Sequence, residues 1–207
     1  MAKRILPYRD YSEHDVLNLF SLDVDESADT LTEWVEAVNG KWDSGVVVKV
    51  NPLKGELPGD LPGGLSKHAS GEKLRKYLGD SPTSAHIGYN AYPYNGMTVE
   101  PAGVGEVAVG ITLRETLAYD ENGEKLLYYK QKLDEAQAVL PGQTVPVLTR
   151  GLVLLDSNAV TGNPGIGAQL EVGADGTLVA DTANGNALVA TVVAKSGSDK
   201  FLCKISF

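Results

Sequence analysis

The segment Phe201-Leu202-Cys203-Lys204-Ile205-Ser206-Phe207 carries a large apolar or thiol side chain at every odd position. Successive side chains of a β-strand point to opposite faces of its sheet, so this period of two predicts a strand that buries its odd positions. The apolar run at 187–194 comes shortly before it and predicts another strand. This part of the sequence is therefore predicted to be β-structure.

Short apolar segments separated by Gly, Pro, Asn and Asp fill the last third of the chain. They cover 145–148, 152–155, 167–172 and 177–180. Pro146 restricts the first of them to a sheet edge or a bulge, because proline has no N–H to donate to a neighbouring strand. Alternation at 107–113 and a β-branched run at 46–50 predict two earlier strands. No long helices alternate with these segments, so we predict a mainly β fold, a sandwich or barrel, and not a parallel α/β sheet.

One or two short helices are expected in the first 80 residues. Thr30-Leu31-Thr32-Glu33 matches a capping box, and apolar residues at helical spacing follow it, so we predict a helix at 31–39. A second, basic helix is predicted at 72–78. The intervening segment 51–64 is rich in Pro and Gly and is predicted to be an exposed loop or spacer.

A turn is predicted in the middle of the chain. Asp120-Glu121-Asn122-Gly123 is typical of a hairpin turn, because Asn-Gly tolerates positive φ angles, and 126–129 is predicted as the return strand. Residues 130–139 fit one or two helical turns as well as extended structure, and the pattern leaves both open.

Composition excludes several classes of function. The chain has 207 residues and a formal net charge of −9, which disfavours a nucleic-acid partner because phosphate binding needs a basic surface. A single cysteine excludes a disulfide framework and multi-cysteine metal sites, and the three histidines are scattered. No run of about 18 apolar residues predicts a membrane span, and the first residues lack the apolar stretch of a signal peptide. We expect no cofactor, no metal and no membrane partner.

Motifs that suggest chemistry have simpler structural explanations. Gly103-Val104-Gly105-Glu106-Val107-Ala108 matches a phosphate-binding pattern, but Glu106 would repel phosphate, so we predict a turn leading into a strand. The acidic run at 23–29 lacks the glycine of a calcium loop. His14 is predicted to be a surface or interface residue, and Cys203 a small buried apolar residue. We therefore predict no catalytic residues, and the chain is not expected to be an enzyme.

The segment 1–24 is predicted to be an extended N-terminal arm that adheres to another protein. Aromatic and apolar residues alternate there with charges, and 16–22 is apolar enough for one strand. Such an arm can add its backbone hydrogen bonds to the edge of a neighbour's sheet. Its predicted contact residues are Tyr8, Arg9, Tyr11, Leu17, Leu19 and Phe20.

A tyrosine-rich loop gives an alternative. Tyr89, Tyr92 and Tyr94 surround Pro93 and precede Asn-Gly, and tyrosine is frequent at protein interfaces and on sugar-facing surfaces. The loop is either a packed turn or a contact patch. The second possibility would make the chain a carbohydrate- or ligand-binding β-domain, as in a tail or fibre component.

Several stretches of the chain resemble capsid decoration (cement) proteins of tailed bacteriophages. These stretches are 8–20, 44–50, 141–151, 175–178 and 189–207. The resemblance covers most of the chain and consists of strand and turn sequences without an invariant chemical motif. It implies a small β-barrel or β-tulip-like body, an extended N-terminal arm, and a place on the capsid exterior.

The sequence predicts three parts: an arm at 1–24, a segment at 25–98 with a helix, the first strand and a Pro/Gly-rich loop, and a β-barrel or sandwich body at 99–207. The helix and the loop are not part of the family pattern and are interpreted as a local insertion. The resemblance also implies a function. The protein would be a non-enzymatic virion component, made in the host cytoplasm, that bridges neighbouring capsid subunits. Its partners would be the major capsid protein and its own copies, as a homotrimer.

Overall fold

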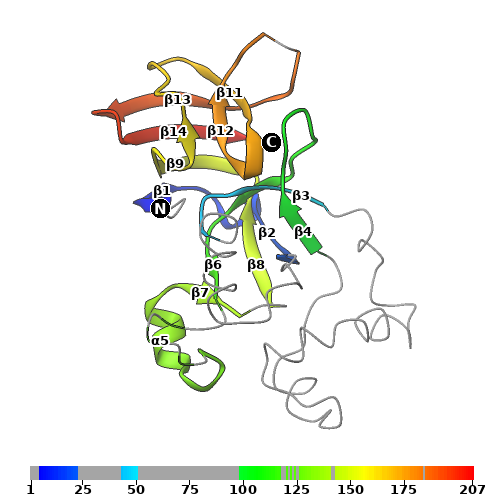
Figure 1. Ribbon diagram of the computed structural model, residues 1–207, viewed down its shortest axis with the longest axis vertical. Coiled ribbons are helices and arrows are strands. Elements are labelled where there is room, and N and C mark those ends of the chain that lie inside the picture. Colours follow the sequence, from blue (N-terminus) through cyan, green and yellow to red (C-terminus); the bar gives the residue numbers. More distant parts are fainter. Residues whose placement is uncertain are drawn as a thin grey trace, which may run out of the picture.

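The computed structural model describes residues 5–22, 43–50, 98–117, 120, 122, 124, 126–140, 143–183 and 185–207 (Figure 1). The predictions for 31–39, 51–64 and 72–78 lie outside these residues. Within them the chain is mainly β, as predicted, with one short α-helix.

Most of the carboxyl-terminal half forms an open, seven-stranded sheet. Its strands, in spatial order, are β1 (Ile5–Asp10), β9 (Arg150–Asp156), β14 (Lys200–Ser206), β13 (Leu188–Ser196), β11 (Gln169–Val172), β12 (Leu178–Ala180) and β10 (Val160–Thr161). All its pairs are antiparallel except β10 with β12. The odd positions Phe201, Cys203 and Ile205 of β14 are fully buried, as the period of two predicts.

A second group of strands pairs in a closed order, so that each strand has two neighbours. It consists of β2 (Val16–Leu22), β4 (Thr98–Pro101), β3 (Val47–Val50), β5 (Gly110–Thr112) and β8 (Thr144–Leu148). We call this group the five-strand ring. β6 (Glu115–Thr116) and β7 (Ala138–Val139) form a separate parallel pair. The helical segments are η1 (Glu13–Asp15), η3 (Leu126–Tyr128), α5 (Lys130–Glu135) and η4 (Ala174–Gly176).

The seven-stranded sheet and the five-strand ring share one hydrophobic core. Val47, Ile111 and Leu148 of the ring belong to the same buried cluster as Val153 and Phe201 of the sheet. This cluster buries branched aliphatic side chains from both groups, which is the main force that holds the two together. The N-terminal segment also joins them, because β1 pairs in the sheet and β2 pairs in the ring.

The prediction of a projecting N-terminal arm is wrong for residues 5–22. The segment is extended, but β1 pairs with β9 and β2 pairs with β8, so its backbone hydrogen bonds are made within the molecule. The β-barrel or sandwich body predicted at 99–207 is mainly β, as expected. Its strands are divided between the open sheet and the ring, and the ring also includes β2 and β3 from earlier in the chain.

Three local predictions have different outcomes. Pro146 lies opposite a register shift in β2, so the predicted bulge is present. Residues 126–128 are a 3₁₀-helix and not a return strand, and α5 follows directly, which resolves the ambiguity at 130–139. Val107 is 85% exposed in the loop between β4 and β5, because pairing with β3 begins only at Val109, whose N–H donates to the carbonyl of Val48.

Candidate functional site

The predicted anchor residues of the N-terminal segment fall into two groups. Tyr11, Leu17 and Phe20 pack, partly buried, against the molecule's own core clusters. Tyr8 and Leu19 are 54% and 48% exposed. Two of these five aromatic and leucine residues are therefore largely exposed, and three stabilise the fold.

Tyr11 is fixed by a close approach to β9. A Cβ atom at Gly151 would lie 2.6 Å from the Cβ of Tyr11 and 3.0 Å from the carbonyl oxygen of Asp10. The carbonyl of Asp15 accepts hydrogen bonds from both the N–H and the hydroxyl of Thr149, each 2.8 Å long. The turn between β1 and β2 thus packs against Gly151 and is hydrogen-bonded to Thr149, the residue between β8 and β9.

Leu17 and Leu19 face different surroundings because β2 is irregular. Its register against β8 shifts between Leu17 and Phe20, at the point where Pro146 lies in β8. An extra residue in one strand leaves a side chain outside the regular alternation. Leu17 and Phe20 consequently pack on the core, and Leu19 is exposed.

The outer face of the seven-stranded sheet carries an apolar strip. In β9, Val153 and Leu155 are fully buried, and Leu152 and Leu154 alternate with them and are half-buried on the opposite face. Leu154 pairs directly with Leu202 of β14. We call Leu152, Leu154 and Leu202, together with Tyr8 on the neighbouring strand β1, the outer strip.

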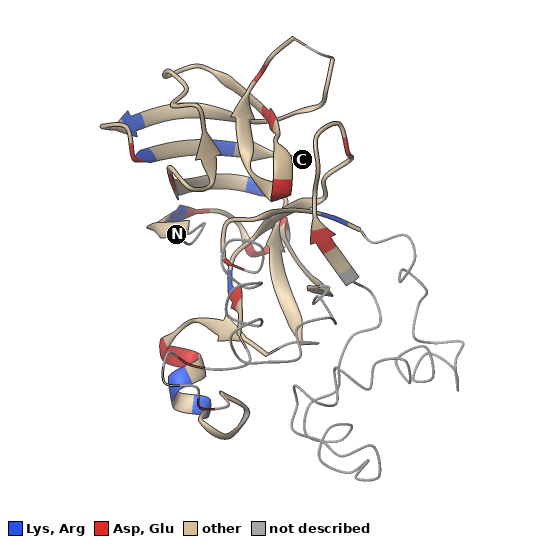
Figure 2. Ribbon diagram, viewed as in Figure 1, with Lys and Arg blue, Asp and Glu red and all other residues tan. Residues whose placement is uncertain are grey.

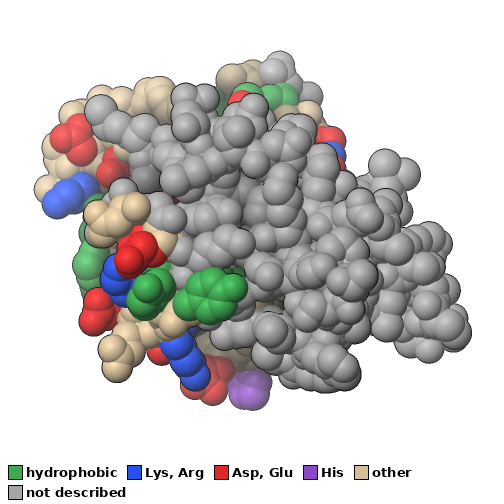
Figure 3. Space-filling model, turned by 60° about the horizontal axis from the view of Figure 1, so that its bottom comes forward, with side chains coloured by type: hydrophobic (Ala, Val, Ile, Leu, Met, Phe, Trp, Pro, Cys, Tyr) green, Lys and Arg blue, Asp and Glu red, His purple; other side chains and the backbone are tan. Residues whose placement is uncertain are grey.

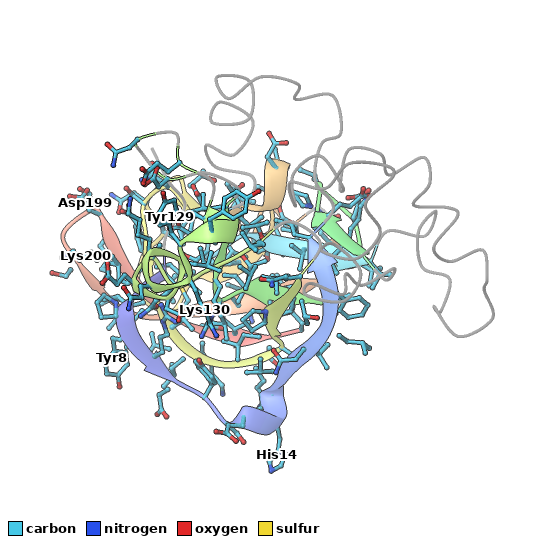
Figure 4. The ribbon with its side chains drawn as sticks, turned by 90° about the horizontal axis from the view of Figure 1, so that it is seen from below. Tyr8, His14, Tyr129, Lys130, Asp199 and Lys200 are labelled. Atoms are coloured by element: carbon cyan, nitrogen blue, oxygen red, sulfur yellow. The ribbon has the colours of Figure 1, made fainter. Side chains whose placement is uncertain are left out.

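Tyr8 lies on the edge strand β1, next to β9. Asp10 of the same strand pairs with Leu152, and Tyr8 lies where the register against β9 shifts, between Ile5 and Arg9, and is 54% exposed. In Figure 4, Tyr8 and Lys200 lie along the same side of the molecule. Tyr8 is therefore counted with the strip as an exposed aromatic side chain at the edge of the sheet.

Basic residues border the outer strip although the chain is acidic overall. Lys200 and Lys204 of β14 are exposed, and Lys204 pairs with Leu152. Arg150, the first residue of β9, is also exposed. Figure 2 shows Lys and Arg on β1, β9, β13 and β14, while the net charge of the whole chain is −9. Asp10, which pairs with Leu152, and Asp156, which pairs with Lys200, lie on the same face. The strip is thus an apolar patch with a border of both charges, in which basic residues are more numerous.

A polar groove lies between the N-terminal turn and the β6–β7 region, with a volume of about 1020 Å³. Its walls come from the β1–η1–β2 segment, from the residues around β5 and β6, and from α5, β7 and β8. The lining residues that bear on function are Arg9, Tyr11, Glu13, His14, Arg114, Asp134 and Gln137. In Figure 3 the one described histidine (purple) lies beside side chains of both charges, and in Figure 4 His14 projects from the turn between β1 and β2.

The two arginines of the groove are not engaged by the part of the chain that the structure describes. Lys49 and Lys132 form ion pairs, whereas Arg9 and Arg114 form neither an ion pair nor a side-chain hydrogen bond among the described residues. Arg9 is half-buried and Arg114 is exposed. Among the described residues, therefore, no partner occupies these two guanidinium groups.

Two ion clusters are structural. Lys49 Nζ lies 2.5 Å from Glu106 Oε1 and 3.1 Å from Glu100 Oε1, and Glu106 Oε2 accepts the N–H of Gly103 at 2.6 Å. The hydrogen bonds from Lys49 and Gly103 lower the pKa of Glu106 below its ordinary value. Residues 103–106 therefore form a turn closed by a carboxylate, in agreement with the turn prediction, although no strand follows before Gly110.

The second cluster orders the segment before α5. Asp120 Oδ1 accepts the N–H groups of Asn122 and Glu124, and Asp120 Oδ2 lies 2.8 Å from Lys132 Nζ. Lys132 also pairs with Glu124 at 2.6 Å and lies 5.2 Å from the ring centre of Tyr129. The hydrogen bond from Lys132 is the largest cause that lowers the pKa of Asp120.

Cys203 and His14 are the two further candidates from the sequence that the structure describes. Cys203 is completely buried, and burial raises its pKa to about 12, so the thiol is neutral, as expected for a small apolar residue. His14 is exposed, as predicted. Across the described ranges no three His, Cys, Asp or Glu side chains are placed to hold a metal ion. No helix in those ranges is long and apolar enough to cross a membrane.

No known protein family, curated protein or solved structure matches this chain. The assignment of a site therefore depends on the geometry above. Tyr89, Tyr92 and Tyr94 of the alternative prediction lie outside the described residues.

The outer strip and the groove were not predicted from the sequence. The signal for the strip is present, because Leu152-Val153-Leu154-Leu155 is apolar at four successive positions and a strand with a solvent-facing side would alternate. The groove has no such signal. Arg9 and Arg114 are 105 positions apart, and only the fold places them in one cavity.

Proposed function

We propose that this chain is a non-enzymatic structural protein of a tailed-phage virion, which binds the outside of the capsid and stabilises it by bridging neighbouring subunits. The observation that carries the proposal is the outer strip. A sheet face with two cross-paired leucines and an exposed tyrosine gains stability when another protein covers it.

The contact that we propose differs from strand addition by an arm. β1 is the edge strand of its sheet and is paired, among the described residues, only with β9. It contains Pro7, a register shift between Ile5 and Arg9, and two charged residues, features that discourage a further strand from pairing at an edge. Adhesion through side chains of the outer strip is therefore favoured over backbone pairing.

The charge distribution supports the same function. A negative chain is repelled by packaged DNA and suits the outer surface of a shell, whereas the border of the strip, with Lys200, Lys204 and Arg150 beside Asp10 and Asp156, suits a partner with side chains of both charges. The partners that we propose are the major capsid protein and further copies of this chain. Repetition of weak contacts over a symmetric shell increases the total binding strength.

Co-sedimentation with capsid shells tests the proposal. Shells assembled from the major capsid protein of the same genome, without this chain, are mixed with purified protein and centrifuged. We expect saturable binding and shells that withstand heating better. Wild-type protein that stays in the supernatant at every concentration would exclude the function.

Paired variants locate the contact. Leu154→Ser with Leu202→Ser should lower shell affinity at least tenfold, because roughly 1.5–3 kcal/mol is expected for covering each large apolar side chain. Val104→Ser is the matched control, since Val104 is 62% exposed on the β4–β5 loop, away from the strip. Loss of binding in the control, with the strip variants unaffected, would place the contact elsewhere.

A further inference from the structure

The groove suggests a second binding function that is separate from the outer strip. We propose that it binds an extended acidic peptide segment of a partner protein, with carboxylates held by Arg9 and Arg114. The two guanidinium groups line one cavity and are unengaged by the described residues. This inference does not depend on the proposed function, because it concerns the isolated chain and a peptide.

Guanidinium chemistry identifies the ligand class. Arginine binds carboxylates through two parallel N–H donors, with a geometry that a lysine ammonium cannot reproduce. The groove adds further hydrogen-bonding groups in the hydroxyl of Tyr11 and the amide side chain of Gln137, which accompany the arginines in the lining. A volume of about 1020 Å³ is large for a single small anion and suits several residues of a chain.

The charges of the groove set limits on that peptide. Glu13 and Asp134 line it as well, so its formal charge is zero, and His14 adds positive charge only when protonated. A carboxylate is attracted near the arginines and repelled near the two acids. The fitting segment therefore carries acidic residues separated by neutral ones, and not an unbroken acidic run.

The backbone of the groove wall has one unusual residue. Gln137 follows α5 with a φ of +51°, and its N–H donates to the carbonyl of Asp134. Glycine or asparagine is the usual residue in this left-handed conformation at the end of a helix, and other side chains are strained there. This strained residue lies in the wall of the groove, where its amide side chain can bind a ligand.

Fluorescence anisotropy with a labelled (Glu-Ser)₅ peptide tests the inference, with a (Lys-Ser)₅ peptide as the charge control. We expect the acidic peptide to bind, with an affinity that falls as salt is raised, and the basic peptide not to bind. Arg9→Gln and Arg114→Gln should each lower the affinity about tenfold, and Arg9→Lys and Arg114→Lys should lower it less.

Arg150→Gln is the matched control variant, because Arg150 is exposed on β9 outside the groove. If Arg9→Gln impairs folding, as a melting curve would show, Arg114→Gln still tests the site because Arg114 is exposed between β5 and β6. The inference would be overturned if the acidic peptide did not bind or if the basic peptide bound more tightly. It would also be overturned if Arg150→Gln lowered the peptide affinity as much as the groove variants do. Shell binding by the same variants is measured separately, so failure of one proposal does not decide the other.

Discussion

Gly151 is the residue at which the N-terminal segment depends most directly on the rest of the fold. The Cβ atom of Gly151→Ala would collide with Tyr11 and with the backbone oxygen of Asp10, at 2.6 and 3.0 Å, and the backbone atoms cannot move away easily. We expect a loss of about 1–3 kcal/mol in the free energy of unfolding, measured by urea denaturation. Gly165→Ala is the control, because nothing lies within 4 Å of its Cβ position. Equal stability of the two variants would contradict the close packing of Tyr11.

Cys203 should be chemically silent in the folded protein. Its thiol is buried in β14, and its pKa of about 12 keeps it protonated at pH 8.5, so a disulfide reagent should label it only when the protein unfolds. Because the folded pKa is raised, this thiol favours folding below its unfolded pKa and loses that contribution as the pH rises. Rapid labelling at pH 8.5 without denaturant would show that β14 opens readily.

Asp120 should titrate below the ordinary range for aspartate. Its pKa is lowered first by Lys132 and then by the N–H of Glu124, so the carboxylate stabilises this segment above about pH 4 and loses that effect as the pH falls through the lowered pKa. NMR titration of the Glu124 amide from pH 7 to 2 reports the transition. Lys132→Met should move the midpoint upward. A midpoint at or above about 3.9 in the wild type would contradict the ion pair.

Among the elements, β1 and β2 provide a direct test of the corrected N-terminal structure. Hydrogen exchange should show protected amides in both strands of the isolated protein, with β2 slower than β1 because β2 has neighbours on both sides. Amides of 5–22 that exchange as fast as an unfolded chain would restore the prediction of a free arm. An unstructured peptide tail fused to the protein serves as the reference, because its amides exchange at the rate of an unfolded chain.

Element type could be predicted from the sequence more reliably than pairing. Alternation in 201–207 and the apolar run at 187–194 predict β14 and β13, because the pattern of a half-buried strand is local. The period of two says nothing about which strand is a neighbour, so the return of β1 to β9 was missed. The bulge in β2 lies opposite Pro146, more than 120 residues away, and for this reason the local pattern at 16–22 does not show that Leu17 packs on the core while Leu19 is exposed.

The candidate surfaces depend even more on long-range structure. The residue types of the N-terminal segment predict six contact residues, but Tyr11, Leu17 and Phe20 pack on the molecule's own core. The sequence predicts only that the leucines of the outer strip lie in strands, because one sequence does not show which face of a strand is covered. The pairing of Leu154 with Leu202 is what turns separate residues into a patch.

At the scale of the whole molecule, the open sheet and the five-strand ring should unfold together. Gly176 of η4 touches β3 so closely that a Cβ atom would lie 2.4 Å from Val46 Cγ1 and 2.6 Å from the Val47 carbonyl oxygen, and its N–H donates to the carbonyl of Ala102. With the shared core cluster, this contact couples the two groups of strands, so we expect one cooperative transition in which fluorescence and far-UV circular dichroism coincide.

The variant Gly176→Ala should lower the free energy of unfolding by about 1–3 kcal/mol, because the new methyl group overpacks the junction and is strained at a φ of +70°. Gly185→Ala is the control with a similar φ of +78° and nothing within 4 Å, so the difference between the two variants measures the junction alone. Two separate transitions in the wild type, or identical losses in the two variants, would mean that the sheet and the ring are independent units.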